Sequence, residues 1–251
     1  MLDFLLYSCY NFKVIYQECF SATGVPFVMI FLWIALYGIA HSAGDWLTRY
    51  CGAADWTYAA VMLLYAVLFV LWTVGKTDIR ITVHGFRPGD FAVCLPLLIL
   101  PVFNLLAGGF RMPDWTDVLV MLSVAVTEEL FFRGWLLSFF RKKGCSSAVL
   151  ATSILFALLH AVNGFENPDG GYILLQILCA FAVSICLCET AIRFDSILPC
   201  AAAHFLTNIT GSGSIAGRGQ ILGLLVCIVL YICFGLLLSS YGKKNSKERV
   251  S

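Results

Sequence analysis

The sequence predicts an all-α membrane protein, a polytopic bundle of about eight transmembrane helices that forms a single domain over residues 1–251. Of its residues, 60% are hydrophobic and only 12% are charged, and the mean hydropathy is +0.88. A soluble globular domain is much less apolar than this. Apolar runs of about 20 residues, the length that crosses a bilayer core of about 30 Å, recur along the chain. The net charge of +1 gives no indication of nucleic-acid binding.

The N-terminal segment, residues 1–20, is expected to form an amphipathic helix at the membrane interface. It is rich in Leu, Phe and Tyr, but Asp3, Asn11, Lys13 and Glu18 interrupt its apolar character. The segment does not have the pattern of a secretory signal peptide, because no basic stretch precedes its apolar residues and no small-residue cleavage site follows promptly.

Eight apolar runs predict the membrane-spanning helices. The third run is interrupted by Pro96 and Pro101, and the seventh is short and comparatively polar. No internal repeat, low-complexity tract or second domain is visible, so these runs predict one helical bundle. They are residues 25–43, 56–74, 91–107, 115–140, 146–162, 171–188, 196–210 and 219–241.

The basic residues predict that both termini lie in the cytoplasm, because Lys and Arg concentrate in short loops on the cytoplasmic side of a membrane. In this orientation twelve basic residues are cytoplasmic, and only Arg49, Arg111 and Arg218 lie on the opposite side. An odd number of spans would destroy this separation. The twelve are Lys13, Lys76, Arg80, Arg87, Arg141, Lys142, Lys143, Arg193, Lys243, Lys244, Lys247 and Arg249.

Three ionisable residues, Glu128, Glu129 and Arg133, lie close together in the fourth apolar run, in the sequence T-E-E-L-F-F-R-G-W. An ionisable side chain in a membrane opposes insertion by about 2.5–3.5 kcal/mol, so such residues are rare and usually functional. A buried ion pair that only braces the bundle is the structural alternative, but it would need one acid rather than two. The cluster therefore predicts chemistry or ion movement inside the bilayer.

Helix geometry separates the two glutamates. At roughly 100° per residue, Glu129 and Arg133 are about 40° apart in projection and can form an ion pair. Glu128 is about 140° from Arg133, so its carboxylate can face other helices. We therefore expect Glu129 to be neutralised in place and Glu128 to be available as a general base.

Two further runs carry polar side chains at a similar depth. The fifth has His160 one turn after Phe156, and the seventh has His204 and Asn208 four residues apart on one face. With a rise of about 1.5 Å per residue, Glu128, His160 and the His204–Asn208 pair all lie roughly 14–21 Å from the cytoplasmic ends of their helices. Three helices thus place polar groups in one layer. Hydrogen bonds that only join helices are the alternative for these side chains.

These motifs resemble those of the CPBP family, which contains the CAAX prenyl endopeptidases and the bacterial Abi proteins linked to bacteriocin processing and self-immunity. The chain has E-E-x-x-x-R, F-x-x-x-H and H-x-x-x-N in this order, each inside an apolar run. Each motif is weak alone, whereas the ordered set is specific. The resemblance covers residues 115–210, which it identifies as the catalytic core.

The resemblance implies an intramembrane endopeptidase that cleaves a small hydrophobic or membrane-associated peptide. It implies that Glu128 and His160 bind and activate the attacking water. His204 and Asn208 would then stabilise the oxyanion, as preorganised donors do in a site of low dielectric constant.

The same resemblance gives supporting roles to Glu129, Arg133 and Phe156. It favours a glutamate-dependent mechanism with no metal and no other cofactor. Glu and His can ligate zinc, but the chain has no H-E-x-x-H motif, so zinc is the disfavoured alternative.

We expect a multi-pass protein of a bacterial plasma membrane, whose partners are the lipid bilayer and a hydrophobic peptide or leader-peptide substrate. The sequence does not indicate an oligomeric state. One rival function is a non-enzymatic bacteriocin-immunity or scaffold protein that acts by binding. Another is a proton-coupled transporter that uses the glutamates and histidines as a relay, although no inverted repeat supports it.

His41 and two turn-rich loops lie outside the motifs of the proposed site. His41 has no motif partner and is expected to be a hydrogen-bonded structural residue. The turn-rich loops 163–171 and 211–219 follow helices of the proposed site, and they are either mobile flaps over it or simple connections.

Overall fold

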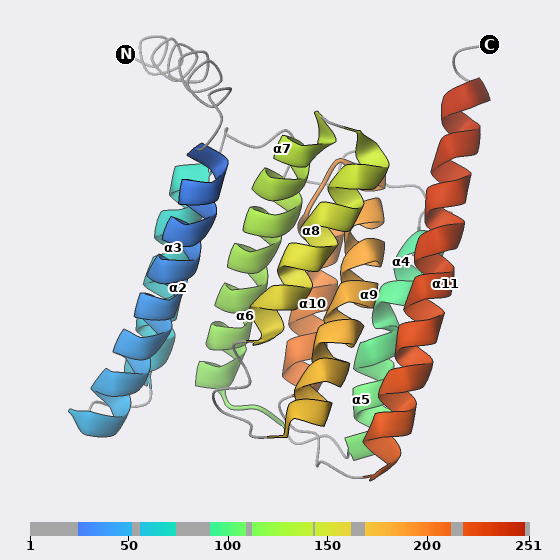
Figure 1. Cartoon of the computed structure of the whole chain (residues 1–251). Coiled ribbons are helices and arrows are strands. Elements are labelled where there is room, and N and C mark those ends of the chain that lie inside the picture. Colours follow the sequence, from blue (N-terminus) through green and yellow to red (C-terminus); the bar gives the residue numbers. More distant parts are fainter. Residues whose placement is uncertain are drawn as a thin grey trace. The chain divides into compact units, whose positions relative to one another are not determined.

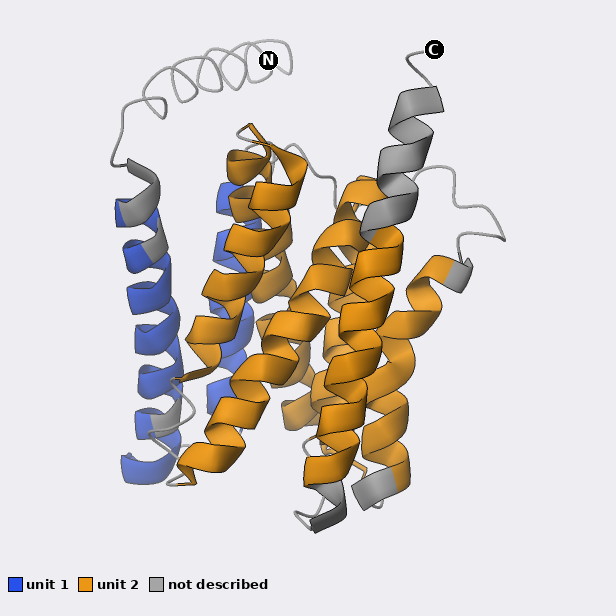
Figure 2. Cartoon of the chain, turned by 45° about the vertical axis from the view of Figure 1, so that its right-hand side comes forward, with its two compact units in different colours: residues 1–76 blue, residues 77–251 orange. Residues whose placement is uncertain are grey.

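The computed structural model describes residues 25–51, 56–73, 91–108, 112–142, 144–161, 169–211 and 218–248. The chain divides into two compact units, residues 1–76 and 77–251 (Figure 2). Within the described residues, helices occupy all eight predicted runs. The predicted interfacial helix at residues 1–20 lies outside the described residues, as do most of the loops 163–171 and 211–219. A single domain over residues 1–251 stays a prediction.

The first unit is a hairpin of α2 (Val25–Tyr50) and α3 (Trp56–Thr73) (Figure 1). The two helices approach closely where Gly44 meets Tyr58, because a Cβ atom on Gly44 would collide with the tyrosine ring. The Tyr58 hydroxyl lies 2.6 Å from Nδ1 of His41. His41 is therefore hydrogen-bonded within the hairpin, as predicted, and its structural role stays a prediction.

The second unit is a bundle whose successive helical segments run in alternating directions (Figure 1). In it α9 packs against both α8 and α11, while α10 packs against both α5 and α6. These two helices therefore connect the segments that carry the predicted site. The elements are α4 (Phe91–Cys94), η2 (Leu95–Leu98), α5 (Ile99–Gly108), α6 (Trp115–Glu129), η3 (Leu130–Leu136), α7 (Leu137–Arg141), α8 (Cys145–Leu159), α9 (Gly170–Phe194), α10 (Leu198–Gly211) and α11 (Arg218–Glu248).

Local sequence determines where several of these helices begin. The carboxylate of Asp114 accepts hydrogen bonds from two backbone N–H groups in the first turn of α6, and Asp169 does the same for α9. Such caps satisfy N–H groups that have no partner inside the helix. The short reversal between α7 and α8 depends on Gly144, whose φ of 123° is strained for any residue with a Cβ atom.

The interruption predicted in the third run is confirmed, because a 3₁₀ turn, η2, separates α4 from α5. Pro101 has no N–H group and so leaves the Leu97 carbonyl without its usual helical donor. The Tyr231 hydroxyl, from α11, lies 3.5 Å from this carbonyl and accepts a hydrogen bond of 3.0 Å from the Leu100 N–H group. A broken helix persists in an apolar environment only where such partners replace the lost backbone bonds.

The fourth run is continuous, but it is not an α-helix throughout. Residues Leu130–Leu136 form the π-helix η3, and the Leu137 N–H group bonds to the Phe132 carbonyl five residues earlier. Short π-helical turns occur mostly inside α-helices and frequently at functional sites. The predicted separation of 140° between Glu128 and Arg133 assumed an α-helix, so it does not apply across this segment.

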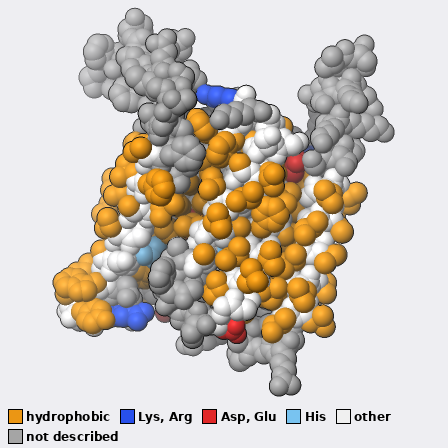
Figure 3. All heavy atoms as spheres, in the orientation of Figure 1, with side chains coloured by type: hydrophobic (Ala, Val, Ile, Leu, Met, Phe, Trp, Pro, Cys, Tyr) orange, Lys and Arg blue, Asp and Glu red, His pale blue; other side chains and the backbone are white. Residues whose placement is uncertain are grey.

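The protein is a membrane protein with several apolar helices. Three helices of the described residues, Trp56–Thr73, Gly170–Phe194 and Ile221–Leu238, are long and apolar enough to cross a bilayer, and shorter apolar helices are Leu95–Leu106 and Cys145–Leu159. On the face of the second unit seen in Figure 3, hydrophobic side chains cover the middle and the few charged side chains lie toward the ends. The number of spans and their orientation stay predictions.

Candidate active site

A series of buried polar side chains connects three helical segments of the second unit. Arg133, on η3, donates from Nη1 to Oε1 of Glu129 at 2.9 Å and from Nη2 to Oγ of Ser184 at 2.8 Å. All three side chains are fully buried. The predicted Glu129–Arg133 ion pair is therefore confirmed. Ser184, on α9, anchors this pair to a neighbouring helix.

His204, on α10, lies between the two glutamates. Its Nδ1 atom is 2.8 Å from Oε1 of Glu129, and its Nε2 atom is 3.9 Å from Oε2 of Glu128. Nδ1 donates in the first contact, because an ionised carboxylate only accepts hydrogen bonds. The second separation is too long for a direct hydrogen bond and is one that a bridging water can span. Glu129 thus binds an arginine and a histidine at the same oxygen atom.

Phe156, on α8, lies beside both histidines and the arginine. The Arg133 Cζ atom is 4.2 Å from the centroid of the Phe156 ring, and the ring centroids of His160 and His204 are 4.9 and 5.8 Å from it. A cation over an aromatic face is stabilised by the ring quadrupole. Phe156 therefore holds the charged groups and the two histidines at one level of the bundle.

The backbone of α8 orients His160. Nδ1 of His160 lies 3.0 Å from the Phe156 carbonyl. Because a carbonyl oxygen only accepts hydrogen bonds, Nδ1 carries the proton, and Nε2 of the neutral ring is left as an acceptor. The F-x-x-x-H spacing, one helical turn, thus selects the histidine tautomer as well as its position.

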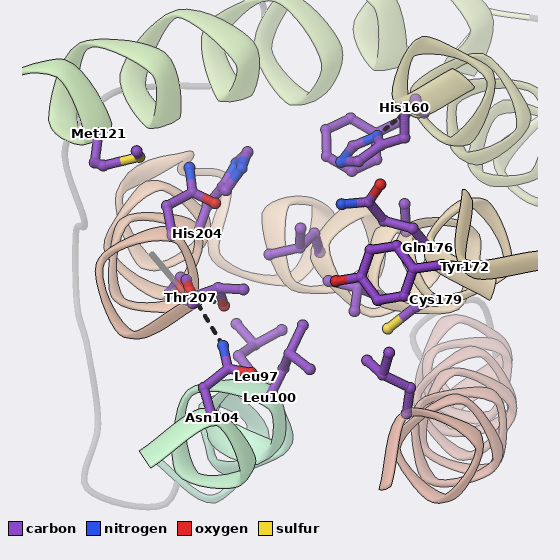
Figure 4. A pocket seen from close by; sticks show the side chains of 18 residues that line it. Leu97, Leu100, Asn104, Met121, His160, Tyr172, Gln176, Cys179, His204 and Thr207 are labelled. Atoms are coloured by element: carbon purple, nitrogen blue, oxygen red, sulfur yellow. Dashed lines mark hydrogen bonds between the residues drawn. The ribbon is translucent and has the colours of Figure 1, made fainter. Parts of the chain in front are cut away.

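A cavity of about 330 Å³ lies next to this cluster (Figure 4). Four of the predicted residues line it, namely Phe156, His160, His204 and Asn208. Its other walls come from η2, α5, α6, α9 and α11, and they are mostly aliphatic. Glu128 is not part of the wall, but its side chain is 9% exposed and its Oε2 atom lies 3.9 Å from Nε2 of His204, which is part of the wall.

Four polar residues of the cavity wall, Asn104, Tyr172, Gln176 and Thr207, were not predicted from the sequence. Figure 4 shows Tyr172 and Gln176 extending from α9 into the cavity, across from His204. Tyr172 and Gln176 are four residues apart near the start of the sixth apolar run, so the spacing that identified His204 and Asn208 was present here too. Asn104 is an isolated amide in the third run, and no motif indicates its role.

Ser184 was also missed, because a lone serine in an apolar run gives no sign of its partner. The predicted Asn208 lies on the cavity wall, and within the described residues its side-chain amide makes no hydrogen bond. Its amide is thus available to a bound molecule. Within the described ranges, no group of three or more His, Cys, Asp and Glu side chains is arranged to hold a metal ion.

Comparison with known protein families finds a match that covers part of the second unit. Residues 112–210 match the family model Rce1-like, described as type II CAAX prenyl endopeptidase Rce1-like. This segment contains α6 through α10 apart from the last residue of α10, and every site residue predicted from the motifs. The resemblance drawn from the motifs is therefore confirmed over almost the same residues. No curated protein and no solved structure matches the chain.

Proposed function

We propose that this chain, whose residues 112–210 are a domain of the Rce1-like type II CAAX prenyl endopeptidase family, is an active intramembrane endopeptidase. One observation carries the proposal: the buried Glu129–Arg133–His204 cluster adjoins a cavity whose wall presents His160 and Asn208. An ion pair that only braced helices would not require hydrogen-bond acceptors and donors around a cavity. A hydrolase requires acceptors to hold the attacking water and donors to stabilise the oxyanion.

In the proposed reaction, Glu128 is the general base and His160 helps to hold the attacking water. The free Nε2 atom of His160 accepts a hydrogen bond from the water, and the Glu128 carboxylate takes its proton as the oxygen attacks the peptide carbonyl. His204 and Asn208 donate to the resulting oxyanion. Glu128 then gives the proton to the leaving amine, which restores the carboxylate and completes the hydrolysis.

The charges around His204 support its role as a donor. Glu128 and Glu129 together carry two negative charges, and Arg133 with a protonated His204 carries two positive charges. A cluster of zero net charge is the least costly one to bury in a membrane. In the protonated ring, Nδ1 donates to Glu129 while Nε2 keeps a proton for an oxyanion, on the side of the ring 3.9 Å from Glu128.

The proposed substrate is a small hydrophobic or membrane-associated peptide, such as a leader peptide, and the proposed location is a bacterial plasma membrane. The cavity wall supports an uncharged segment, because it contains no Lys, Arg, Asp or Glu side chain among the described residues. Apart from the protonated His204, the wall would offer no counter-ion to a charged substrate residue. A non-enzymatic immunity protein would use the same cavity for binding alone.

Hydrolysis of internally quenched hydrophobic peptides by the purified protein, in bilayer nanodiscs, tests the proposal. We expect Glu128→Gln and His160→Ala to abolish cleavage at unchanged thermal midpoints. Glu189→Gln is the matched control, because it removes a helical carboxylate outside the cluster and should leave cleavage intact. Substantial activity in Glu128→Gln would refute the assignment. Peptide binding that survives this change, with no cleavage by the wild type, would favour the immunity function.

A further inference from the structure

A side chain outside the matched family segment is attached to the helix that carries Asn208. Asn104, near the end of α5, donates from Nδ2 to the backbone carbonyl of Thr207 and to the hydroxyl of Thr210, both at 3.3 Å. The Thr210 hydroxyl itself donates to the Leu206 carbonyl at 2.7 Å. Its oxygen is therefore left as the acceptor for Asn104, so the two contacts are chemically compatible. Figure 4 shows Asn104 reaching from α5 toward Thr207.

The carbonyl that Asn104 holds belongs to the peptide group that joins Thr207 to Asn208. Because this group is planar, fixing its oxygen also fixes the direction in which the chain enters Asn208. Asn208 lies in the last turn of α10, which ends at Gly211. Helix ends fray, and their final turns have fewer internal hydrogen bonds than the middle. An external donor at this turn thus stabilises the part of α10 that most requires it.

A residue without a side chain, Gly211, faces the Asn104 amide. A Cβ atom on Gly211 would lie 3.3 Å from Nδ2 of Asn104, which is tighter than most contacts in folded proteins. Glycine at this position therefore leaves room for the amide. The contact lies where α5 packs against α10, and it is partly buried.

We infer that Asn104 is a positioning residue, which holds the last turn of α10 so that the Asn208 amide is aligned with the reacting carbonyl group. This inference rests on the proposed function, in which Asn208 donates to the oxyanion. It assigns part of the catalytic arrangement to the segment 91–108, which lies outside the matched residues 112–210. Asn104 acts through Asn208 and not on the substrate itself.

A double-mutant cycle tests this coupling through kcat. Asn208→Ala removes one oxyanion donor, a change that lowers kcat by about 100–1,000-fold in comparable sites. A small displacement of a donor lowers the rate less, so we expect Asn104→Ala to lower kcat by roughly 10-fold and to leave KM within about twofold. In the Asn208→Ala background, Asn104→Ala should have no further effect. Equal losses of kcat in both backgrounds, or a change in KM alone, would overturn the inference.

A second measurement is independent of activity. In Asn104→Ala, and in Asn104→Leu, which keeps the side-chain bulk, backbone amides of the last turn of α10 should exchange hydrogen faster than in the wild type. The first turn of α10 should be unchanged and serves as the internal control. Unchanged exchange in the last turn would overturn the inference. Failure of the proposed function is seen separately, as an inactive wild type or an active Glu128→Gln variant.

Discussion

Glu129→Ala should destabilise the protein much more than Glu128→Ala does. Glu129 is the partner of Arg133 at 2.9 Å and of His204 at 2.8 Å, and both it and Arg133 are fully buried. Removing one member of a buried ion pair leaves an uncompensated charge and costs about 3–5 kcal/mol. For a chain of this length such a loss corresponds to a decrease in the thermal midpoint of about 6–20 °C. Glu128 lies 3.9 Å from His204 and its side chain is 9% exposed, and Arg133 keeps its Glu129 partner when Glu128 is removed, so this change should reduce activity and cost less stability.

Thermal unfolding in detergent, followed by a fluorogenic thiol reagent, provides the assay. Cys186, Cys188 and Cys200 are buried and react only when the bundle opens. Adding Arg133→Leu to Glu129→Ala removes the orphaned charge and should recover part of the lost stability. Matched midpoints for Glu129→Ala and Glu128→Ala, or a double variant less stable than Glu129→Ala, would refute the reasoning from the ion pair.

Three further predictions concern the anchor of the arginine, the metal and the orientation. Ser184→Ala should lower the free energy of unfolding by about 1.5–3 kcal/mol, because it removes a hydrogen bond to the charged Arg133. Ser123→Ala is the control, because the Ser123 hydroxyl bonds within its own helix. Equal losses of stability in the two variants would argue against the anchoring role of Ser184. Exhaustive chelation should leave peptidase activity intact. A metal-free mechanism would be contradicted if the protein held one zinc ion per chain, lost activity when the zinc was removed and regained it when the zinc was returned. In a cysteine-free background, Asn167→Cys should react with an impermeant thiol reagent in intact cells while Arg141→Cys is protected, and the reverse pattern would invert the orientation.

The composition and the short-range spacing of the sequence predicted the helices and most of the candidate site. Apolar runs located the helices of the described residues. A helix that crosses a bilayer must be long and apolar, and both properties can be read directly from the sequence. The Glu129–Arg133 pair was predictable for a similar reason, since residues four apart on a helix are neighbours whatever the fold. The histidine of F-x-x-x-H was predictable as well, because its backbone partner, Phe156, lies on the same helix.

The tertiary structure decided which groups meet across helices. The helix geometry predicted that Glu128, rather than Glu129, faces other helices. In the structure His204, from α10, binds Glu129 directly and lies 3.9 Å from Glu128. The contacts of Ser184 and Asn104 could not be predicted either, because each joins two separate helices. No local pattern in the sequence indicated the π-helical turn η3. Hydropathy predicts which segments lie in the membrane, but the partner of a buried polar group is determined by the rotation and depth of the neighbouring helix. These are properties of the packed bundle, and no local pattern encodes them.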